Sequence, residues 1–414
     1  MQYITDLHIH SRYARACSKA LTLENIDQWC IWKGINIVAC GDFTHPAWFS
    51  EISTKLKSVG EGLYQLKEGS KGTYFLMGTE LSCIYKKHDQ VRRVHILVFM
   101  PDIESVKKLN MYLDSIGNIN ADGRPILGLD VEELTKRVID INADGFLIPA
   151  HAWTPWFAIF GSKSGFDSIE ECFGKQKQHI FAIETGLSSD PPMNWSLSVL
   201  DDIALVSNSD AHSLPNLGRE ANVFELEKPS YFELRDAIKN NDSKKFLYTI
   251  EFFPEEGKYH EDGHAGCKLR MSPEESKKNK NICPQCGKNL TIGVLNRVDK
   301  LADRKLGKHK GKIPYKSIIP LQEIIAESLG RGKNTKGVQT MYQEMIAKIG
   351  NEFSILIDES IATIEKNSSS RIAEAIRRMR DGEVEIAPGY DGIYGTIKLF
   401  KEGESIQDIQ TKLI

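Results

Sequence analysis

Near its N-terminus the chain reads Tyr3-Ile4-Thr5-Asp6-Leu7-His8-Ile9-His10, an apolar run that ends in two histidines on one side of an extended segment. Metal-type side chains border other short apolar runs in the same way: Asp42, Glu80, His95, His151 and Asp210-Ala211-His212. In a parallel β/α barrel the loops at the carboxyl ends of the strands converge on one face. We therefore expect these side chains, although far apart in the chain, to meet in one pocket.

The predicted pocket combines imidazole and carboxylate groups. This donor set suits zinc, manganese or iron, and it can hold two or three ions close together. Such ions lower the pKa of bound water and neutralise phosphate oxygens as charge builds on them. The pattern therefore predicts hydrolysis of a phosphate ester without a protein nucleophile.

Length and composition are those of an ordinary globular protein. The 414 residues carry a net charge of −3, which by itself indicates no class of partner. We find no apolar run long enough to cross a membrane and no secretory leader. Five cysteines are scattered through apolar surroundings and are expected to be buried thiols, which fits a reducing cytoplasm: Cys17, Cys30, Cys40, Cys83 and Cys172.

Three domains are expected from the change of pattern along the chain. Residues 1–250 alternate apolar runs with helical stretches, as βα units do. Residues 251–316 are rich in Lys and Arg, and we expect a loop at 272–278. Residues 317–414 are mainly helical. In that last domain the apolar spacing predicts helices over 321–329, 340–349, 354–364 and 368–379.

The ordered motifs of the first domain resemble the polymerase-and-histidinol-phosphatase (PHP) family. That resemblance implies a distorted seven-stranded β/α barrel with up to three metal ions. The ligand sets that it implies are His8, His10, Glu80 and Asp210 for one ion, Glu80, His95 and His151 for a second, and His212 with Asp42 for a third.

The third site departs from the family pattern. The usual Asp-His pair is Asp42-Phe43 here, and a histidine expected shortly after the first motif is absent, with Arg15-Ala16-Cys17 in its place. His45 is a possible substitute. We expect Asp6 to orient a ligand imidazole by accepting its other N–H. Glu184 ends another strand-like run, and supporting the metal centre and capping a helix both remain open for it.

A second metal site is predicted by the spacing of the remaining cysteines. His264 and Cys267 are followed after fifteen residues by Cys283-Pro284-Gln285-Cys286. Three thiolates and one imidazole form a closed shell typical of a structural zinc ion. His260 competes with His264 as the fourth ligand, and we prefer His264 because its separation from Cys267 matches the other half.

The whole chain resembles the endonuclease Q family. The resemblance is carried by the barrel motifs, Gly257-Lys258-Tyr259-His260, the four-ligand module and the helical C-terminal region with Pro388-Gly389-Tyr390-Asp391-Gly392. It implies a DNA-repair endonuclease that nicks on the 5′ side of hypoxanthine, uracil, xanthine or an abasic site.

Further features are compatible with a DNA substrate. A basic run from Arg297 to Lys316 could contact phosphates. The loop after His151 is rich in aromatic residues, which suit stacking on bases, and Trp48 is a candidate to join them. We expect substrate contacts from Trp153, Trp156, Lys163, Glu184 and Tyr390.

Two other functions would account for part of this sequence pattern. A small-molecule phosphatase of the histidinol-phosphate class would need neither the cysteine module nor the C-terminal region. A non-catalytic DNA-binding accessory protein would be expected to have lost metal ligands, and only the third position here lacks one. The residues identify no protein partner, although a sliding clamp or a helicase is a candidate.

Overall fold

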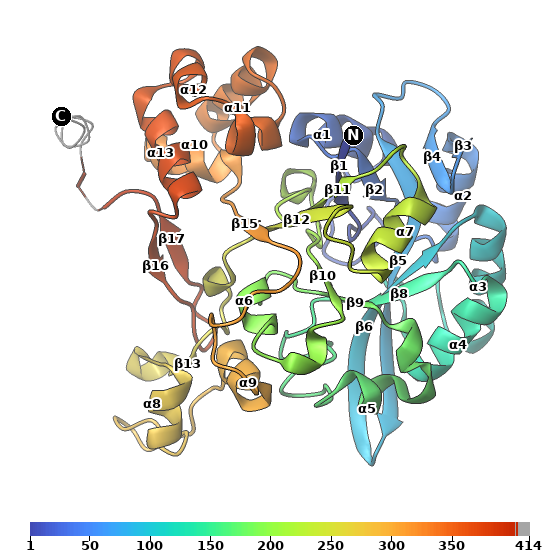
Figure 1. Ribbon diagram of the computed structural model, residues 1–414, viewed down its shortest axis with the longest axis horizontal. Helices are drawn as coiled ribbons and strands as arrows, with labels where there is room; N and C mark the ends of the chain where they lie inside the picture. The colour runs from blue at the N-terminus through green and yellow to red at the C-terminus, as the bar shows by residue number, and fades with distance from the viewer. Residues whose placement is uncertain (402, 405–414) are drawn as a thin grey trace.

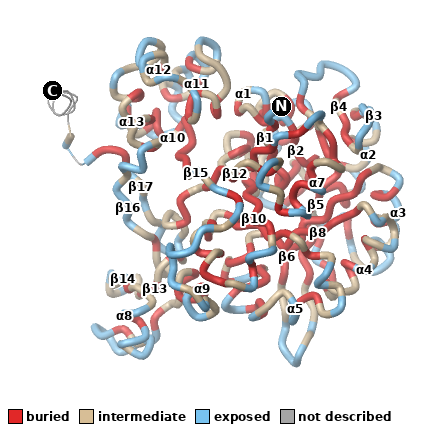
Figure 2. Tube along the Cα trace, viewed as in Figure 1, coloured by how far each residue is buried: buried red, intermediate tan, exposed pale blue. Residues whose placement is uncertain are grey.

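The computed structural model describes residues 1–401, 403 and 404. Figure 1 shows a large α/β lobe, with a small cysteine-containing region and a helical C-terminal region beside it. The strands of the large lobe are mostly buried, whereas the small region is largely exposed (Figure 2). No helix among the described residues has the length and apolar character needed to cross a membrane.

The large lobe is built on a mixed sheet with the order β15-β12-β11-β1-β2-β5-β4-β3. Strands β6 and β7 branch from it at β5, and β8 pairs with β6. Its strands are β1 (Gln2–Asp6), β2 (Ile37–Ala39), β3 (Leu56–Gly60), β4 (Leu63–Leu66), β5 (Tyr74–Lys87), β6 (Gln90–Met100), β7 (Ile126–Leu127), β8 (Phe146–Pro149), β11 (Ala221–Glu225), β12 (Phe246–Glu251) and β15 (Tyr315–Ser317). A separate parallel pair consists of β9 (Ala182–Glu184) and β10 (Ala204–Val206).

Helices cover this sheet: α1 (Leu23–Lys33), α2 (Pro46–Lys55), α3 (Ile103–Ile116), α4 (Val131–Ile141), α5 (Ile169–Phe173), α6 (Pro191–Asn194) and α7 (Tyr231–Lys239). Short 3₁₀ turns are η1 (Gly174–His179), η2 (Ser198–Leu200), η3 (Leu214–Asn216), η4 (Pro254–Glu256) and η5 (Ala265–Cys267). Helix α1 shows how the sequence sets these bounds. The Thr22 side chain accepts the Asn25 N–H at its start, and Gly34 ends it with a φ of 92°.

The strands run less uniformly than βα alternation predicts. Strands β1, β2 and β5 are parallel, but β6 is antiparallel to both β5 and β8. A tight turn joins β5 to β6, with positive φ at His88 and Asp89. The sequence had suggested that Glu80 and His95 border short strands. In the structure both residues lie inside the long strands of a hairpin.

One core cluster gathers alternate side chains from many strands of the lobe. Its buried members come from β1, β2, β4, β5, β6, β8, β9, β10, β11 and β12 and from helix α7, among them Tyr3, Ala39, Leu76, Leu97, Ile148, Ala182, Val206 and Phe224. Alternation follows from the two-residue period of a strand. The separate pair β9–β10 therefore packs against the same interior as the mixed sheet.

The cysteine-containing region holds β13 (Asp262–His264), β14 (Leu269–Met271), α8 (Pro273–Lys278) and α9 (Val294–Leu301). The loop expected at 272–278 is wrong, because α8 forms there. Ser272 and Glu275 form a capping box at its start, and Pro273 occupies the first turn. The local capping residues outweighed the polar composition that had suggested a loop.

The C-terminal region contains α10 (Leu321–Leu329), α11 (Lys336–Lys348), the π-turn η6 (Ser354–Asp358), α12 (Ile361–Asn367), α13 (Ser370–Asp381), β16 (Glu385–Ala387) and β17 (Thr396–Lys398). The single helix expected over 354–364 is wrong, because the chain breaks before Ser360, which caps α12. The Arg380 guanidinium donates to the carbonyls of Ile355, Leu356 and Glu359, which satisfies the interrupted turn.

This helical region is docked on the large lobe through a buried ion pair. Nζ of Lys33 in α1 lies 2.8 Å from Oε2 of Glu352, and both side chains are almost fully buried. The Tyr342 hydroxyl and the Leu321 N–H donate to the same carboxylate. Loss of either ionic partner would leave a buried charge unpaired, so this contact fixes the position of the helical region.

Candidate metal centre

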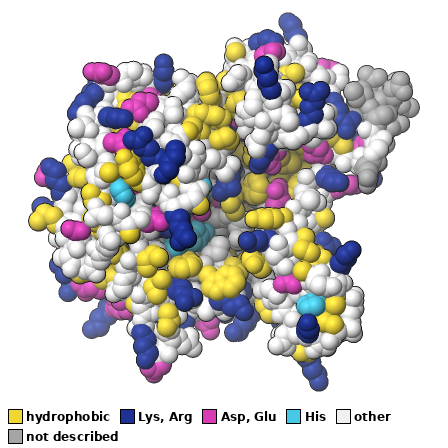
Figure 3. Space-filling view, turned by 180° about the vertical axis from the view of Figure 1, so that it is seen from behind, with side chains coloured by type: hydrophobic (Ala, Val, Ile, Leu, Met, Phe, Trp, Pro, Cys, Tyr) yellow, Lys and Arg dark blue, Asp and Glu magenta, His cyan; other side chains and the backbone are white. Residues whose placement is uncertain are grey.

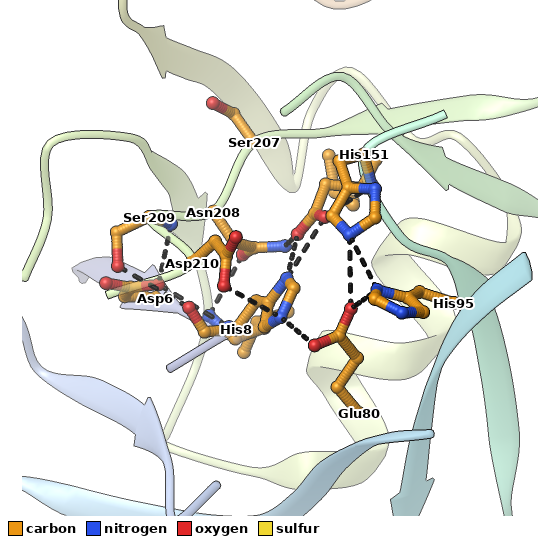
Figure 4. A network of polar contacts seen from close by, with 12 residues as sticks. Asp6, His8, Glu80, His95, His151, Ser207, Asn208, Ser209 and Asp210 are labelled. Atoms are coloured by element: carbon orange, nitrogen blue, oxygen red, sulfur yellow. Dashed lines mark hydrogen bonds and ion pairs between the residues drawn. The ribbon is translucent and has the colours of Figure 1, made fainter. Parts of the chain in front are cut away.

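Two groups of metal-type side chains share one carboxylate in the large lobe. Within each group, one potential ligand atom per residue lies within 4.8 Å of the others. The groups are His8, His10, Glu80 and Asp210, and Glu80, His95 and His151. Figure 4 shows Glu80 between His8 on one side and His95 and His151 on the other.

The two oxygens of Glu80 face different histidines. Oε1 lies 2.6 Å from Nδ1 of His95 and 3.1 Å from Nε2 of His151. Oε2 lies 3.4 Å from Nε2 of His8 and 3.2 Å from Nε2 of His10. A carboxylate that serves two groups in this way can bridge two cations.

Three residues of the centre have left-handed backbone conformations. Asp42, His151 and Asp210 have φ angles of 43°, 29° and 46°, each just after the carboxyl end of a strand. Such conformations are costly for residues other than glycine and persist where surrounding contacts impose them. These backbone conformations set the directions of the Asp42, His151 and Asp210 side chains after β2, β8 and β10.

Glu184 supports the centre rather than capping a helix. Its carboxylate oxygens lie 3.1 Å from Nδ1 of His8, and Oε2 accepts the backbone N–H of His151 at 2.7 Å. The Asn208 amide donates to Oε1 at 2.9 Å. Oγ1 of Thr154 lies 3.2 Å from Nδ1 of His151. Contacts of this kind fix the orientation of ligand imidazoles.

The side chains expected for a third ion do not join either group. Asp42 lies 2.9 Å from Nδ1 of His10 and accepts the Ser11 N–H, so it lies behind His10. His212 packs its ring 4.6 Å from that of His10, and its Nδ1 lies 2.8 Å from the Asp210 carbonyl. His45 stacks on the ring of Tyr13.

Asp6 does not orient an imidazole, contrary to the expectation. Its carboxylate accepts backbone N–H groups of His8, Ser209 and Gly218, with lengths of 3.5, 3.1 and 3.0 Å. Burial raises the pKa of Asp6 to about 6, although these hydrogen bonds oppose the rise. Asp6 thus ties the first motif to the loop that carries Asp210.

Electrostatics of the centre are dominated by burial and by opposite charges. Burial alone would lower the pKa of His8, but Glu184, Asp210 and Glu80 outweigh it and raise the pKa well above the ordinary range. Burial lowers the pKa of His95 to about 4, despite the neighbouring Glu80. A cation binds neutral imidazoles, so it would compete with the proton that the neighbouring carboxylates favour on His8.

Arg124 is a charged residue of the centre that sequence reasoning missed. Its Nη1 donates to Oε2 of Glu80 at 2.9 Å. Nearby Asn208 and Thr154 were also missed. Arg124, Asn208 and Thr154 lie in loops and belong to no motif of regular spacing. Of the three, Asn208 could have been found from the sequence, because it lies in the polar run 207–210 that contains Asp210.

The four residues of the cysteine module come together. Ligand-type atoms of His264, Cys267, Cys283 and Cys286 lie within 4.8 Å of one another. His260 lies outside this group and is buried, with Nδ1 unpaired among the described side chains. The module packs only a small apolar cluster around Cys283. A cation bound by these four residues would therefore be its main cross-link.

A pocket of about 290 Å³ lies beside the second histidine group. Its lining includes Thr154 and Trp156 from the loop after His151, with Tyr259 and Tyr394 from later parts of the chain. Trp156 is 41% exposed and Tyr394 is 71% exposed. Figure 3 shows histidine and hydrophobic side chains together at the hollow between the large lobe and the two smaller regions.

Two residues expected to contact substrate are otherwise engaged. Trp153 is 1% exposed, and its Nε1 donates to Asn194. Trp48 is fully buried and donates to the carbonyls of Cys40 and Gly41. Neither ring is available to a base, whereas Lys163 is exposed.

The C-terminal turn presents a different tyrosine from the one expected. Tyr390 packs against the module, where a Cβ at Gly263 would lie 2.3 Å from its Cδ2. Asp391 holds the same turn by accepting from Thr291 and from the Ala265 N–H. Tyr394 lines the pocket instead.

Part of the basic run is used within the protein. Arg297 is buried and donates to the carbonyls of Phe160 and Phe166 and to Asp167. Arg304 pairs with Asp201 through two hydrogen bonds of 2.7 and 2.6 Å. These two arginines brace loops of the large lobe, whereas Lys305, Lys308 and Lys310 of the run are exposed.

Comparison with solved structures gives two matches over nearly the whole chain. The first is the crystal structure of the lesion-specific endonuclease PfuEndoQ from Pyrococcus furiosus, with a TM-score of 0.86, 32% identity and 99% of each chain covered. The second is endonuclease Q in complex with a 27-mer duplex carrying an abasic lesion at the active site. It has a TM-score of 0.85 and 32% identity over 99% of this chain and 100% of that chain.

Sequence comparison gives relatives without an assigned function. The uncharacterized protein YqxK of Bacillus subtilis is 30% identical over 407 residues, which cover 95% of this chain and 98% of that protein. The uncharacterized protein MJ0043 of Methanocaldococcus jannaschii is 37% identical over 254 residues, 60% of this chain but only 31% of that protein. A family model described as the MJ0043 C-terminal domain matches residues 320–383.

Proposed function

This chain belongs to the endonuclease Q family, and from that premise we propose that it is a metal-dependent DNA-repair endonuclease that cuts on the 5′ side of a damaged nucleotide. As a member of this family it is a hydrolase. The damaged nucleotides that we propose are abasic sites and the deaminated bases hypoxanthine, uracil and xanthine.

One observation carries the proposal: Glu80 belongs to two metal-type groups at once. Two cations held a short distance apart can stabilise both the attacking and the leaving oxygen of a phosphodiester. The solved endonuclease Q complex, which matches 99% of this chain, carries an abasic lesion at its active site. The shared carboxylate and the family resemblance therefore support the same chemistry.

The residues of the centre fit divalent cations. Nε2 of His8 is buried without a hydrogen-bond partner among the described residues, yet it lies near the carboxylates of Glu80 and Asp210. An unpaired buried nitrogen facing carboxylates is what a cation would satisfy. When bound, zinc, manganese, magnesium or iron would supply Lewis acidity and activate water.

The chain's own residues prepare this site. Glu184 and Asp42 hold the Nδ1 atoms of His8 and His10, which leaves each Nε2 directed at Glu80. Thr154 contacts Nδ1 of His151. We propose two ions here and a third that would be held by His212 and Asp42. The third would be weaker, because the Asp42 oxygens already contact Nδ1 of His10 and the Ser11 N–H.

We propose that residues 1–250 form a PHP-type distorted barrel. Side chains from ten strands, together with those of α7, enter one buried cluster, which supports closure through β9 and β10. We propose residues 251–316 as a module held by one structural zinc ion and a basic linker, and residues 317–414 as a helical domain. Free thiols in the rest of the chain are compatible with a reducing cytoplasm.

We propose that the pocket lined by Trp156, Tyr259 and Tyr394 receives the damaged nucleotide. An enzyme that reads a damaged base must take it out of the helical stack, which requires a pocket with aromatic walls. Lys258 supports this role, because its Nζ lies 5.5 Å from the ring centre of Tyr259 and 5.8 Å from that of Tyr394. A cation held between two rings at the pocket would attract a phosphate.

Cleavage of end-labelled duplexes tests the proposal. Duplexes carrying inosine, uracil or an abasic site are compared with an unmodified duplex, with manganese, magnesium and zinc each supplied in turn. We expect a single nick on the 5′ side of the lesion and an intact control. Hydrolysis of p-nitrophenyl phosphate without any nicking would instead identify a small-molecule phosphatase.

A further inference from the structure

Arg124 places a positive charge beside the carboxylate shared by the two metal-type groups. Its Nη1 donates to Oε2 of Glu80, the oxygen that also faces His8 and His10. Within the described part of the chain this is the one side-chain acceptor of its guanidinium. A guanidinium has five N–H donors, so most of its capacity remains available.

The backbone holds Arg124 in place. Oδ1 of Asp122 accepts the N–H of Arg124 at 3.0 Å and that of Arg15 at 3.1 Å. Gly123 donates to the Tyr13 carbonyl at 3.1 Å, and a Cβ on Gly123 would lie 2.5 Å from Oδ2 of Asp42. These contacts hold the backbone of the loop against the first motif and Asp42.

The Arg124 side chain is 27% exposed, so it contacts the buried Glu80 carboxylate and also reaches solvent. A residue that served only to neutralise Glu80 would gain nothing from that exposure. A divalent cation at Oε2 would compete with the guanidinium for the same oxygen. Arg124 would then be left beside the centre with its charge unpaired.

We propose that Arg124 contacts the non-bridging oxygens of the scissile phosphate. Guanidinium geometry matches two phosphate oxygens at once, and its charge opposes the negative charge that builds on them during cleavage. Arg124 is therefore a catalytic residue of the reaction, and a lysine at this position would supply charge without the paired donors. This assignment rests on the proposed function for its substrate.

Phosphate binding tests the assignment without any cleavage. Inorganic phosphate is titrated by calorimetry into manganese-loaded wild type, Arg124→Ala, Arg124→Lys and Arg137→Ala. We expect about tenfold or greater weakening in the alanine variant, a smaller loss in the lysine variant and no change in Arg137→Ala. Arg137 is a suitable control because its side chain is 40% exposed and pairs with Glu133, outside the centre.

Cleavage of the abasic duplex then separates catalysis from structure. We expect Arg124→Ala to lose about 10²–10³ in kcat with its manganese content unchanged, and to recover activity when guanidinium ion, but not urea, is added. Unchanged phosphate affinity, or loss of manganese from the alanine variant, would overturn the assignment. The wild type could bind phosphate more tightly than Arg124→Ala and still cut no lesion-bearing duplex. That result would refute the proposed function and leave Arg124 as a phosphate ligand.

Discussion

Both carboxylate oxygens of Glu184 lie 3.1 Å from Nδ1 of His8, although 176 residues separate the two in the chain. The same carboxylate also accepts the backbone N–H of His151. Glu184 therefore joins residues of both metal-type groups. A single buried side chain controls the direction of one imidazole and the backbone position of another.

Replacing Glu184 with Gln should weaken the metal centre without unfolding the protein. An amide cannot offset the charge on His8 as a carboxylate does, and losses of about 10–100-fold in metal affinity or activity follow from such changes. Manganese titration and cleavage rates measure the effect. Glu104→Gln, an exposed change in α3, should leave both unchanged, and equal behaviour of the two variants would contradict the role of Glu184.

Asp210→Ala should abolish cleavage while DNA binding stays largely intact. Oδ1 of Asp210 lies 3.0 Å from Nε2 of His10, so the change removes one ligand-type oxygen from the first group. Gel-shift binding and cleavage of the abasic duplex are measured side by side. The control is Asp114→Ala, exposed in α3. Normal cutting by Asp210→Ala would show that the hydrolytic centre lies elsewhere.

Cys283→Ser should remove one equivalent of zinc and loosen the cysteine module. Cys283 is buried in the small apolar cluster and belongs to the four-residue group, so its loss affects both packing and binding. Metal analysis gives the zinc content, and hydrogen exchange follows residues 262–294. Cys172→Ser changes a buried thiol outside the module and should keep the zinc. A folded, zinc-free Cys283→Ser module would refute a structural ion.

Trp156→Ala should weaken binding of lesion DNA more than binding of an intact duplex. Stacking of a base on an aromatic ring contributes about 1–3 kcal/mol, which corresponds to roughly 5–150-fold in affinity. Fluorescence anisotropy with both duplexes measures the difference. Trp32→Ala, a partly exposed change in α1, provides the control. An equal loss for both duplexes would place Trp156 outside lesion recognition.

Stability should fall as pH rises from about 4.5 to about 8 because of Glu251. Burial raises the pKa of Glu251 to about 8 from its ordinary 4.5, so the folded state holds a proton that the unfolded state has released. Each such proton lowers the free energy of unfolding by about 1.4 kcal/mol per pH unit within this window. Urea unfolding of wild type and Glu251→Gln measures it, and the variant should show a flatter profile. Parallel profiles would contradict the assignment to Glu251.

Local patterns predicted much of the secondary structure. Helix α1 begins at the Thr22 cap and ends at Gly34, as its sequence indicates. A loop was expected at 272–278, but the capping box of Ser272 and Glu275 outweighs the polar composition and α8 forms there. The break before Ser360 is accompanied by Arg380 of α13, whose guanidinium donates to the carbonyls of Ile355, Leu356 and Glu359. No local pattern contains that contact.

By itself the sequence determined the chemistry available to this protein: histidines and carboxylates bordering apolar runs, and a second set of cysteines at a metal-binding spacing. These features are local, because strand period and residue type depend on near neighbours. Only the tertiary structure decided which oxygen of Glu80 faces which histidine, that Glu184 holds His8, that Arg124 reaches the centre and that Tyr394 rather than Tyr390 lines the pocket. Those relations join loops distant in the chain, and their positions result from packing of the whole core rather than from any one segment.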